Sequence, residues 1–429
     1  MSDTSTSDPL SLLACRIQET QDTRASHLRE VEKLDALLAR MQIDFNELTN
    51  RAALVASIPN EILGAIFEAG TYLLPRSYPD LQFEILVSQV TRHWRNVAMS
   101  TPSLWSRIVM IKEPPYKSEM VEAYLTRSGS LPLDIWLKLT VGSPPTDSIL
   151  RSIIPHVGRW RRVWLHCIRP RRHLLSMFRS STFPLLESIQ IIFDDDQTEE
   201  LDDYYEGAPG DTNRMLNDGA PLLKTVQIKG MSLHRCMLPL SAVTTLHIHR
   251  ALSRPTLVTM LAIFGNLRSL AHLVLYGRVV RDPGLISSST STILFPVLSS
   301  LHIISSSNQL ACLPMLGIIS APLLECLSLE DASDEDIKTL MQTTRWSTNP
   351  PRYPSLSSLT LSFIVHLQPC TWRLIEQSFT TVTHLAVLDI MATELSNVLL
   401  QTVGVDSNSS LHTDIPWPRL QMLSLGEEI

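Results

Sequence analysis

Apolar residues recur along the last two thirds of the chain in the pattern P-x-L-x-x-L-x-L. Complete copies begin at Pro184, Pro221, Pro296, Pro322, Pro354 and Pro418, and copies without the proline begin at Gly158, Ser241, Arg268 and Thr380. The commonest spacing between successive starts is 26 to 28 residues. Repeats of this length with an L-x-x-L-x-L core are typical of leucine-rich repeats, in which each repeat forms one short strand and one helix or turn. The pattern therefore predicts an irregular, leucine-rich-repeat-like α/β solenoid over residues 120–429, with a parallel sheet on its concave side.

Three segments between the repeats, 256–264, 334–343 and 393–403, have apolar residues at helical spacing and are expected to be helices on the convex side. A second interpretation of the same pattern is an ordinary α/β domain whose strands are regularly spaced. In that domain the parallel sheet would be covered on both faces.

The alternation L-x-L places two side chains of each predicted strand in the core and the side chain between them on the opposite face. In a solenoid these middle residues form one row on the concave side, and such rows are recurrent protein-binding surfaces. We therefore expect this row to bind a target protein. Its members are Gln190, Gln227, His247, Val274, His302, Ser328 and Thr360, and it continues through Ala386 and Ser424.

The N-terminal region is predicted to be a disordered start, residues 1–13, followed by a helical, coiled-coil segment over residues 14–50. This segment contains no Pro or Gly, and its apolar residues follow a heptad, in which Val31, Leu38 and Phe45 alternate with Leu34, Met41 and Leu48. Two interpretations are open. In the one we adopt, the helix packs against or extends the following segment of its own chain. In the other, the helix pairs with a second copy.

Residues 51–110 are predicted to form three short helices with an apolar surface. Apolar residues lie at helical spacing after Pro59 and again over 83–99, and Pro102 begins a last turn. A unit this small buries little apolar surface, so its remaining apolar residues are expected to contact a partner or an adjoining domain. The alternative is a three-helix unit whose Trp and Leu side chains fill only its own core.

The same stretch resembles the F-box proteins, in particular the large fungal, basidiomycete-type group. The resemblance rests on Ile58-Pro59-Asn60-Glu61-Ile62-Leu63, Ile66-Phe67, Val90, Trp94-Arg95, Ala98, Thr101-Pro102, Leu104-Trp105 and Ile108. The departures are Ile58 in place of Leu, Thr91 in place of Cys, and a loop over 72–82. The resemblance implies docking on a Skp-type adaptor, and through it on a cullin, by Pro59, Ile62, Leu63, Ile66, Phe67, Val90, Trp94, Leu104 and Trp105.

Composition and charge argue against several classes of partner. The chain has 429 residues and a formal net charge of -7, which indicates two or three structural units and neither a nucleic-acid nor a membrane partner. The arginines at 159, 161 and 162 alternate with Trp160 and Trp164. This pattern fits a basic nucleic-acid patch or, as we interpret it, the solvent side of a strand whose Trp160, Val163 and Leu165 face inward. The N-terminus lacks a signal-peptide pattern, and an intracellular location, in the cytoplasm or nucleus, is expected.

No pattern of catalytic or metal-binding residues is evident. The six cysteines show no CxxC spacing and are expected to be reduced and mostly buried, and the chain contains no HExxH or Gly-rich phosphate loop. The acidic run 194–203 lacks the spacing of a calcium-binding loop and is expected to be a solvated loop. We therefore predict no enzymatic activity and no cofactor. The predicted function is the substrate-recognition subunit of an SCF-type cullin ubiquitin ligase. The alternative is a leucine-rich-repeat scaffold that self-associates through its N-terminal helix.

Overall fold

The computed structural model describes fifteen parts of the chain. These are residues 9–73, 82–111, 118–139, 144–167, 181–193, 216, 219–230, 233–236, 238–251, 254–280, 292–305, 313–343, 352–364, 367–388 and 419–426. The chain divides into two compact units, Met1–Leu104 and Trp105–Ile429. This division falls inside the 51–110 segment, so the last residues of the F-box-like motif belong to the second unit. Within the described residues, no helix is both long and apolar enough to cross a membrane.

The first unit is helical. Its elements are α1 (Pro9–Ala52), the short 3-10 helix η1 (Leu54–Ser57), α2 (Asn60–Leu73), α3 (Phe83–Val90) and α4 (Arg92–Met99), and a further 3-10 turn, η2 (Pro102–Trp105), crosses into the second unit. The core of α2 to α4 is built from Leu63, Phe67, Val87 and Val97, and the Phe67 ring lies 5.1 Å from the ring of Trp94. The Thr91 hydroxyl caps α4 by accepting a hydrogen bond from the Trp94 amide at 3.0 Å.

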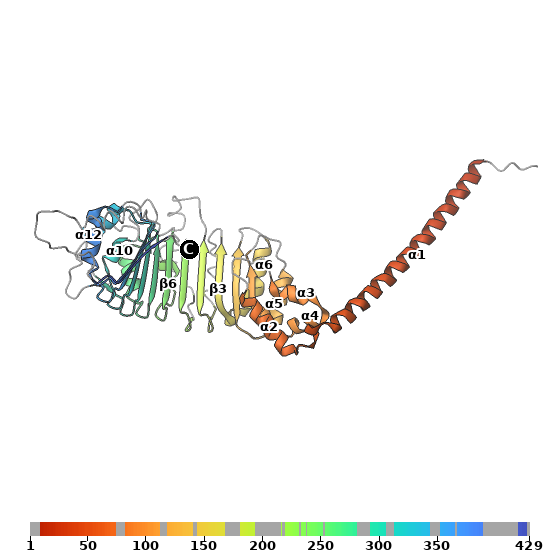
Figure 1. The fold of residues 1–429 in the computed structure, drawn as a ribbon, viewed down its shortest axis with the longest axis horizontal. Coiled ribbons are helices and arrows are strands. Elements are labelled where there is room, and N and C mark those ends of the chain that lie inside the picture. The colour runs from red at the N-terminus through yellow and green to blue at the C-terminus, as the bar shows by residue number, and fades with distance from the viewer. Residues whose placement is uncertain are drawn as a thin grey trace, which may run out of the picture. The chain divides into compact units, whose positions relative to one another are not determined.

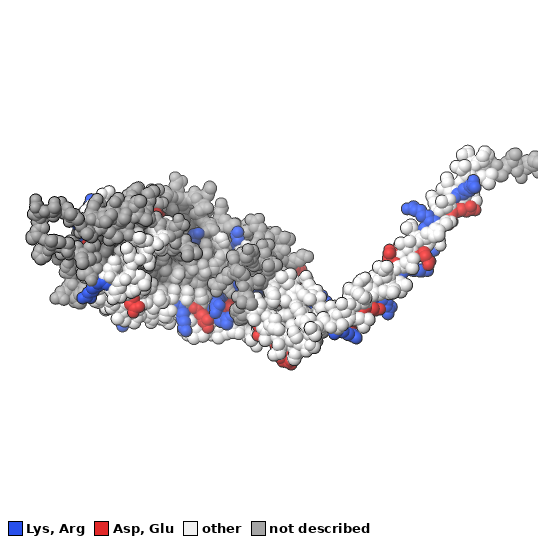
Figure 2. Space-filling view, in the orientation of Figure 1, with Lys and Arg blue, Asp and Glu red and all other residues white. Residues whose placement is uncertain are grey.

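Helix α1 is exposed along its whole length. Its 44 residues include none that is buried, and the heptad residues Leu38 and Phe45 are 69% and 65% exposed. Lysine, arginine, aspartate and glutamate residues are distributed along its surface (Figure 2). The predicted helix over 14–50 is confirmed, but it begins at Pro9, so the expectation of disorder is wrong for residues 9–13. Residues 1–8 lie outside the described part of the chain. The apolar heptad positions are not buried against the rest of the chain, so packing along this seam is not seen. Extension of the following segment and pairing with a second copy both stay predictions.

The second unit is built on a parallel sheet of twelve strands, which lie side by side in chain order (Figure 1). The strands are β1 (Arg107–Met110), β2 (Leu133–Leu139), β3 (Trp160–Cys167), β4 (Ser188–Phe193), β5 (Thr225–Gly230), β6 (Thr245–Ala251), β7 (His272–Tyr276), β9 (Ser300–Ile304), β11 (Cys326–Glu330), β12 (Ser358–Ser362), β13 (His384–Leu388) and β14 (Met422–Gly426). A separate parallel pair joins β8 (Ile293–Leu294) to β10 (Ile319–Ser320). Because each strand of the large sheet pairs with the strands of the preceding and following repeats, the unit has the strand order of a solenoid.

Helices connect many of these strands. They are α5 (Ser118–Arg127), α6 (Pro144–Ile153), η3 (Ile154–Arg159), α8 (Leu233–Cys236), α9 (Leu257–Phe264), α10 (Leu313–Leu316), α11 (Asp334–Thr343) and α12 (Pro369–Ser378). Two of the predicted helices, 256–264 and 334–343, are confirmed as α9, which is capped by the Thr256 hydroxyl, and as α11. The third, 393–403, lies outside the described residues. Helices α5, α6 and α12 were not predicted.

The core of the sheet follows the L-x-L alternation. In β11, for example, Leu327 and Leu329 are 1% and 0% exposed, and they pair in register with Leu301 and Ile303 of β9. Each of the ten predicted repeats supplies one strand, which confirms the repeat prediction. Strands β1 and β2 extend the sheet by two strands that the pattern did not reveal, and the sheet therefore begins before residue 120.

A recurring backbone contact precedes the strands. The carbonyl of Lys224 accepts hydrogen bonds from the amides of Thr244 and Thr245, and the carbonyl of Thr244 accepts them from Ala271 and His272. The carbonyls of Ala271, Ser299, Glu325, Ser357 and Thr383 accept the same pair of bonds from the next repeat. These bonds satisfy backbone groups in the turns and fix the register between neighbouring repeats.

The burial of the cysteines differs from what the sequence predicted. Of the described cysteines, Cys15, Cys326 and Cys370 are exposed, and Cys167 is buried, so the expectation of mostly buried thiols is wrong for these residues.

The last strand, β14, is exposed at all five positions, including Leu425 at 52%. Its pattern matches that of the other strands, but its apolar residues are not buried.

The register gives opposite expectations for neighbouring residues. Leu327→Ala is expected to lower the free energy of unfolding of the full chain by about 2 to 5 kcal/mol, because a buried side chain is truncated. Ser328→Arg is expected to change it by less than about 0.5 kcal/mol, because Ser328 lies half-buried on the opposite face. Urea denaturation followed by circular dichroism measures both. A large loss for Ser328→Arg with little for Leu327→Ala would contradict the register.

Candidate functional site

One continuous row of side chains crosses the face of the sheet opposite its aliphatic core. We call this face the open face and the row the open row. In register, the open row consists of Val109, Trp136, Trp164, Gln190, Gln227, His247, Val274, His302, Ser328, Thr360, Ala386 and Ser424. The seven residues predicted to bind a target are all members and are all half-buried. The structure therefore places them side by side, as the repeat register predicted.

Three members of the open row, Val109, Trp136 and Trp164, were missed by sequence reasoning. Trp164 lies between the buried residues Val163 and Leu165, which were correctly predicted to face inward. Trp136 lies between Ile135 and Leu137 in a strand that was not recognised. The signal that could have found both tryptophans is the alternation of apolar residues: Val163-Trp164-Leu165 lies in the recognised copy that begins at Gly158, and Ile135-Trp136-Leu137 has the same form.

The middle of the open face carries a group of histidines. His247 and His249 lie on β6, and His302 on β9 lies in register beside Val274 of β7. Burial, followed by the charges of His302 and His272, lowers the pKa of His247. Burial, followed by the charges of His247 and Lys229, lowers the pKa of His249. Both imidazoles therefore favour the neutral form.

Hydrogen bonds and ring contacts hold this group together. The Nε2 atoms of Gln227 and His249 are 3.2 Å apart, and the His249 ring lies 5.3 Å from the ring of Tyr276. Nε2 of His302 lies 2.9 Å from a carboxylate oxygen of Glu330. Among the described residues, no group of three or more His, Cys, Asp or Glu side chains could hold a metal ion. The acidic run 194–203 lies outside the described residues.

The first strands of the open face carry cations and aromatic rings. The guanidinium of Arg107 lies over the Trp136 ring, 5.0 Å from its centroid, and the rings of Trp164 and His166 are 5.5 Å apart. The carboxylate of Asp134 accepts two hydrogen bonds from Arg161, at 2.9 and 2.6 Å. This bidentate pair neutralises the carboxylate of Asp134. The solvent side of β3 that we predicted from the arginine pattern is therefore present, with Trp164 and Arg162 on it.

The nine residues expected to dock on an adaptor fall into two groups. Leu63, Phe67, Leu104 and Trp105 are each at most 2% exposed, so they are buried within the chain itself. Ile62, Ile66 and Val90 are 54%, 49% and 56% exposed, Pro59 is exposed, and Trp94 is half-buried. The apolar residues at helical spacing in 51–110 therefore include both buried and exposed positions.

Trp105 packs within the second unit. Its ring meets the Tyr124 ring of α5 edge-on, with centroids 5.2 Å apart, and the Arg127 guanidinium lies 4.3 Å from its centroid. Both contacts hold the turn before β1 against α5. Trp105, near the end of the motif, thus anchors the first strand of the sheet.

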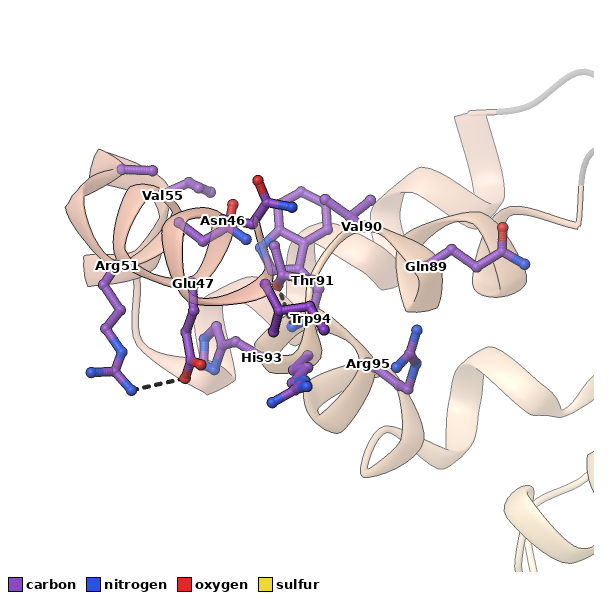
Figure 3. A pocket seen from close by; sticks show the side chains of 14 residues that line it. Asn46, Glu47, Arg51, Val55, Gln89, Val90, Thr91, His93, Trp94 and Arg95 are labelled. Carbon is purple, nitrogen blue, oxygen red and sulfur yellow. Dashed lines mark hydrogen bonds and ion pairs between the residues drawn. The ribbon is translucent and has the colours of Figure 1, made fainter. Parts of the chain in front are cut away.

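A cavity of about 540 Å³ lies in the first unit, where the end of α1 approaches the junction of α3 and α4. Val55, Val90 and Trp94 line it together with polar side chains such as Asn46 and Gln89 (Figure 3). At its edge, Arg51 pairs with Glu47 at 2.8 Å. The cavity brings Val90 and Trp94 together, the two predicted docking residues contributed by α3 and α4, and combines apolar with hydrogen-bonding groups.

The histidines make the stability of the sheet depend on pH. The unfolded chain binds protons at His247 and His249 near their ordinary pKa of 6.5, whereas the folded chain binds them only at lower pH. The free energy of unfolding is therefore expected to fall as pH drops below about 6.5. The double variant His247→Gln, His249→Gln should lose less stability between pH 7 and pH 5 than the unchanged chain, by urea denaturation. Equal losses in the two proteins would contradict this.

The chain shows little similarity to known proteins. No protein-family model matches its sequence, and no curated protein matches it. A solved structure of a Bacteroides fragilis protein is similar over 63% of this chain and 77% of that one, with 14% sequence identity and a TM-score of 0.33. A likeness this weak carries no inference about function. What the structure itself shows is a mixed α/β protein with a long N-terminal helix and a large parallel sheet.

Proposed function

We propose that this chain is a non-catalytic recognition subunit that binds a target protein with its sheet unit and docks on a partner with its helical unit. The observation that carries the proposal is the open row. Its side chains are held in register across twelve parallel strands, and none of them is needed to fill the aliphatic core. A long, rigid surface of this kind suits capture of a protein segment.

The F-box-like motif supports one partner in particular, the Skp-type adaptor of a cullin ubiquitin ligase. Within the helical unit, Ile62 and Ile66 of α2 are exposed one turn apart, and Leu86 and Val90 of α3 are 45% and 56% exposed. Exposed apolar residues grouped on a surface are a feature of protein-interaction sites. In such a complex the chain would raise the local concentration of a target lysine near the ubiquitin carrier, which requires no acid or base of its own.

Docking is best tested at the exposed residues. Ile62→Asp with Ile66→Asp is expected to reduce recovery of adaptor and cullin at least about tenfold when the tagged full chain is purified from native extract, since apolar anchors are lost. Leu63→Ala and Phe67→Ala are unsuitable, because both side chains are buried and their truncation would destabilise the helical unit itself.

The matched control adds the same charge elsewhere in the unit. Gln21→Glu with Asn96→Asp introduces two negative charges at exposed polar residues of α1 and α4, outside the cavity lined by Val90 and Trp94. This control is expected to recover adaptor normally, and circular dichroism should show equal helix content in all three proteins. Unchanged adaptor recovery by the Ile62 and Ile66 variant, with its fold intact, would overturn the docking proposal.

A second candidate function is self-association through α1. The specific observation in its favour is that the apolar heptad residues of this helix, among them Leu34, Leu38 and Phe45, are each more than half exposed. A helix of this composition is marginally stable alone, whereas a paired helix buries the apolar seam. The chain would then be a scaffold that presents two sheet units.

Self-association predicts a dimer at micromolar concentration by sedimentation velocity. Leu38→Glu with Phe45→Glu is expected to dissociate it, because a charge at a seam position loses the apolar contact. Ala36→Glu with Ala39→Glu, at exposed positions off the seam, should leave the dimer intact. A monomer in the unchanged chain, or a dimer that survives the seam variant, would remove this candidate.

A further inference from the structure

The open face of β1, β2 and β3 differs from the rest of the sheet in charge. Although the whole chain carries a formal charge of -7, the open face of these strands presents Arg107, Lys138 and Arg162. The one carboxylate in the three strands, Asp134, is held by Arg161 through both oxygens. Lys138 and Arg162 form no ion pair with any residue that the structure describes. The result is a local excess of positive charge.

Two aromatic rings lie among these cations. Trp136 and Trp164 are direct neighbours in the register of β2 and β3, and both are half-buried, so one face or edge of each indole reaches solvent. Arg107 is stacked over Trp136, which limits the freedom of its guanidinium before any ligand binds. We call these five residues, Arg107, Trp136, Lys138, Arg162 and Trp164, the basic platform.

Amide side chains continue the row beyond the platform. Gln190 on β4 and Gln227 on β5 are in register with Trp164, and each amide has both donors and acceptors. These groups complement the N–H and C=O groups of a peptide backbone that crosses the strands. The next members, from His247 to Thr360, include no cation that is permanently charged, and Glu330 on β11 adds a negative charge to the same face.

We infer that the basic platform and the two glutamines bind a short, extended, acidic peptide segment of a partner protein. The inference rests on the proposed function of the sheet unit as a protein receptor and names the chemistry of its target. Carboxylates would pair with Arg107, Lys138 and Arg162, and the intervening atoms would pack on the two indoles. Strands β1 to β5 span about 19 Å at about 4.8 Å per strand, which corresponds to about six residues of extended peptide.

The extent of the charge favours a peptide over a nucleic acid. A single strand of nucleic acid would also stack on tryptophan and pair with arginine, but it carries a phosphate at every nucleotide and is bound in grooves that stay basic along the strand. Here the open face carries its fixed cations on β1, β2, β3 and β5, among them Lys229, and the carboxylate of Glu330 lies further along it on β11. A segment with a few carboxylates followed by neutral residues matches this distribution.

The test uses purified full-length chain and a fluorescein-labelled probe peptide in which Glu alternates with Ser. In an extended peptide this alternation places all carboxylates on one side. Fluorescence anisotropy should show saturable binding that weakens as sodium chloride is raised, because exposed charges are screened. The counterpart in which Gln replaces Glu should bind at least about tenfold more weakly, as should an oligothymidylate of similar length.

Variants locate the site. Lys138→Glu with Arg162→Glu is expected to weaken binding of the probe at least about tenfold. Ser300→Glu with Ser358→Glu adds two charges to the open face of β9 and β12 outside the open row, and should change the affinity less than about twofold. Equal weakening by both variants, equal binding of the Gln peptide, or tighter binding of oligothymidylate would each overturn the inference. Circular dichroism of each variant confirms that the comparison is between folded proteins.

Failure of the acidic-peptide inference can be distinguished from failure of the proposed function. If proteins captured from native extract are lost with Ser328→Arg, at the middle of the open row, while the acidic probe does not bind, the receptor proposal holds and the acidic site is wrong. If the acidic probe binds at the platform and Ser328→Arg retains every captured protein, the platform stands as the binding site and the wider row does not.

Discussion

The register between neighbouring parallel strands is the constraint on which the rest of the second unit depends. The backbone bonds that precede each strand, such as those from Thr244 and Thr245 to the Lys224 carbonyl, fix every repeat against the one before it. Once the register is fixed, the alternation of the pleat determines the direction of every side chain. Leucines stack on leucines in the core, and the residues between them form the open row. A shift of one residue in any repeat would exchange these two sets.

This constraint separates stability from recognition within each strand. Residues such as Leu359 and Leu361 are buried and determine whether the repeat folds, whereas Thr360 between them has little effect on the core. The open row can therefore differ in chemistry from one strand to the next, from indole to amide to imidazole to hydroxyl, over the same backbone. The helical unit lacks this separation, because Leu63 and Phe67 in its core lie beside exposed Ile62 and Ile66 on one helix.

The sequence predicted the parts of the fold that follow a fixed period. The ten repeats, the inward positions Val163 and Leu165, and the helices at 256–264 and 334–343 could all be predicted because local spacing determines them. Strands β1 and β2 were missed because neither follows the full P-x-L-x-x-L-x-L pattern. Trp136 was missed with them, because it lies in β2. Helical spacing in 51–110 showed that one side of each helix is apolar. Spacing alone cannot distinguish an apolar residue that is buried within the chain from one that stays exposed on its surface. That distinction depends on which neighbouring segments pack against the helix, a tertiary property.

The exposed final strand has a consequence of its own. β14 pairs with β13 on one side, and its other edge lies at the end of the described sheet. Its five residues are exposed, including Leu423 at 38%, although its sequence has the same alternation as the buried strands. Among the described strands, an edge of this kind offers backbone groups and exposed aliphatic side chains to any strand that approaches it. A strand supplied by another chain would therefore pair with β14 and cover its leucines.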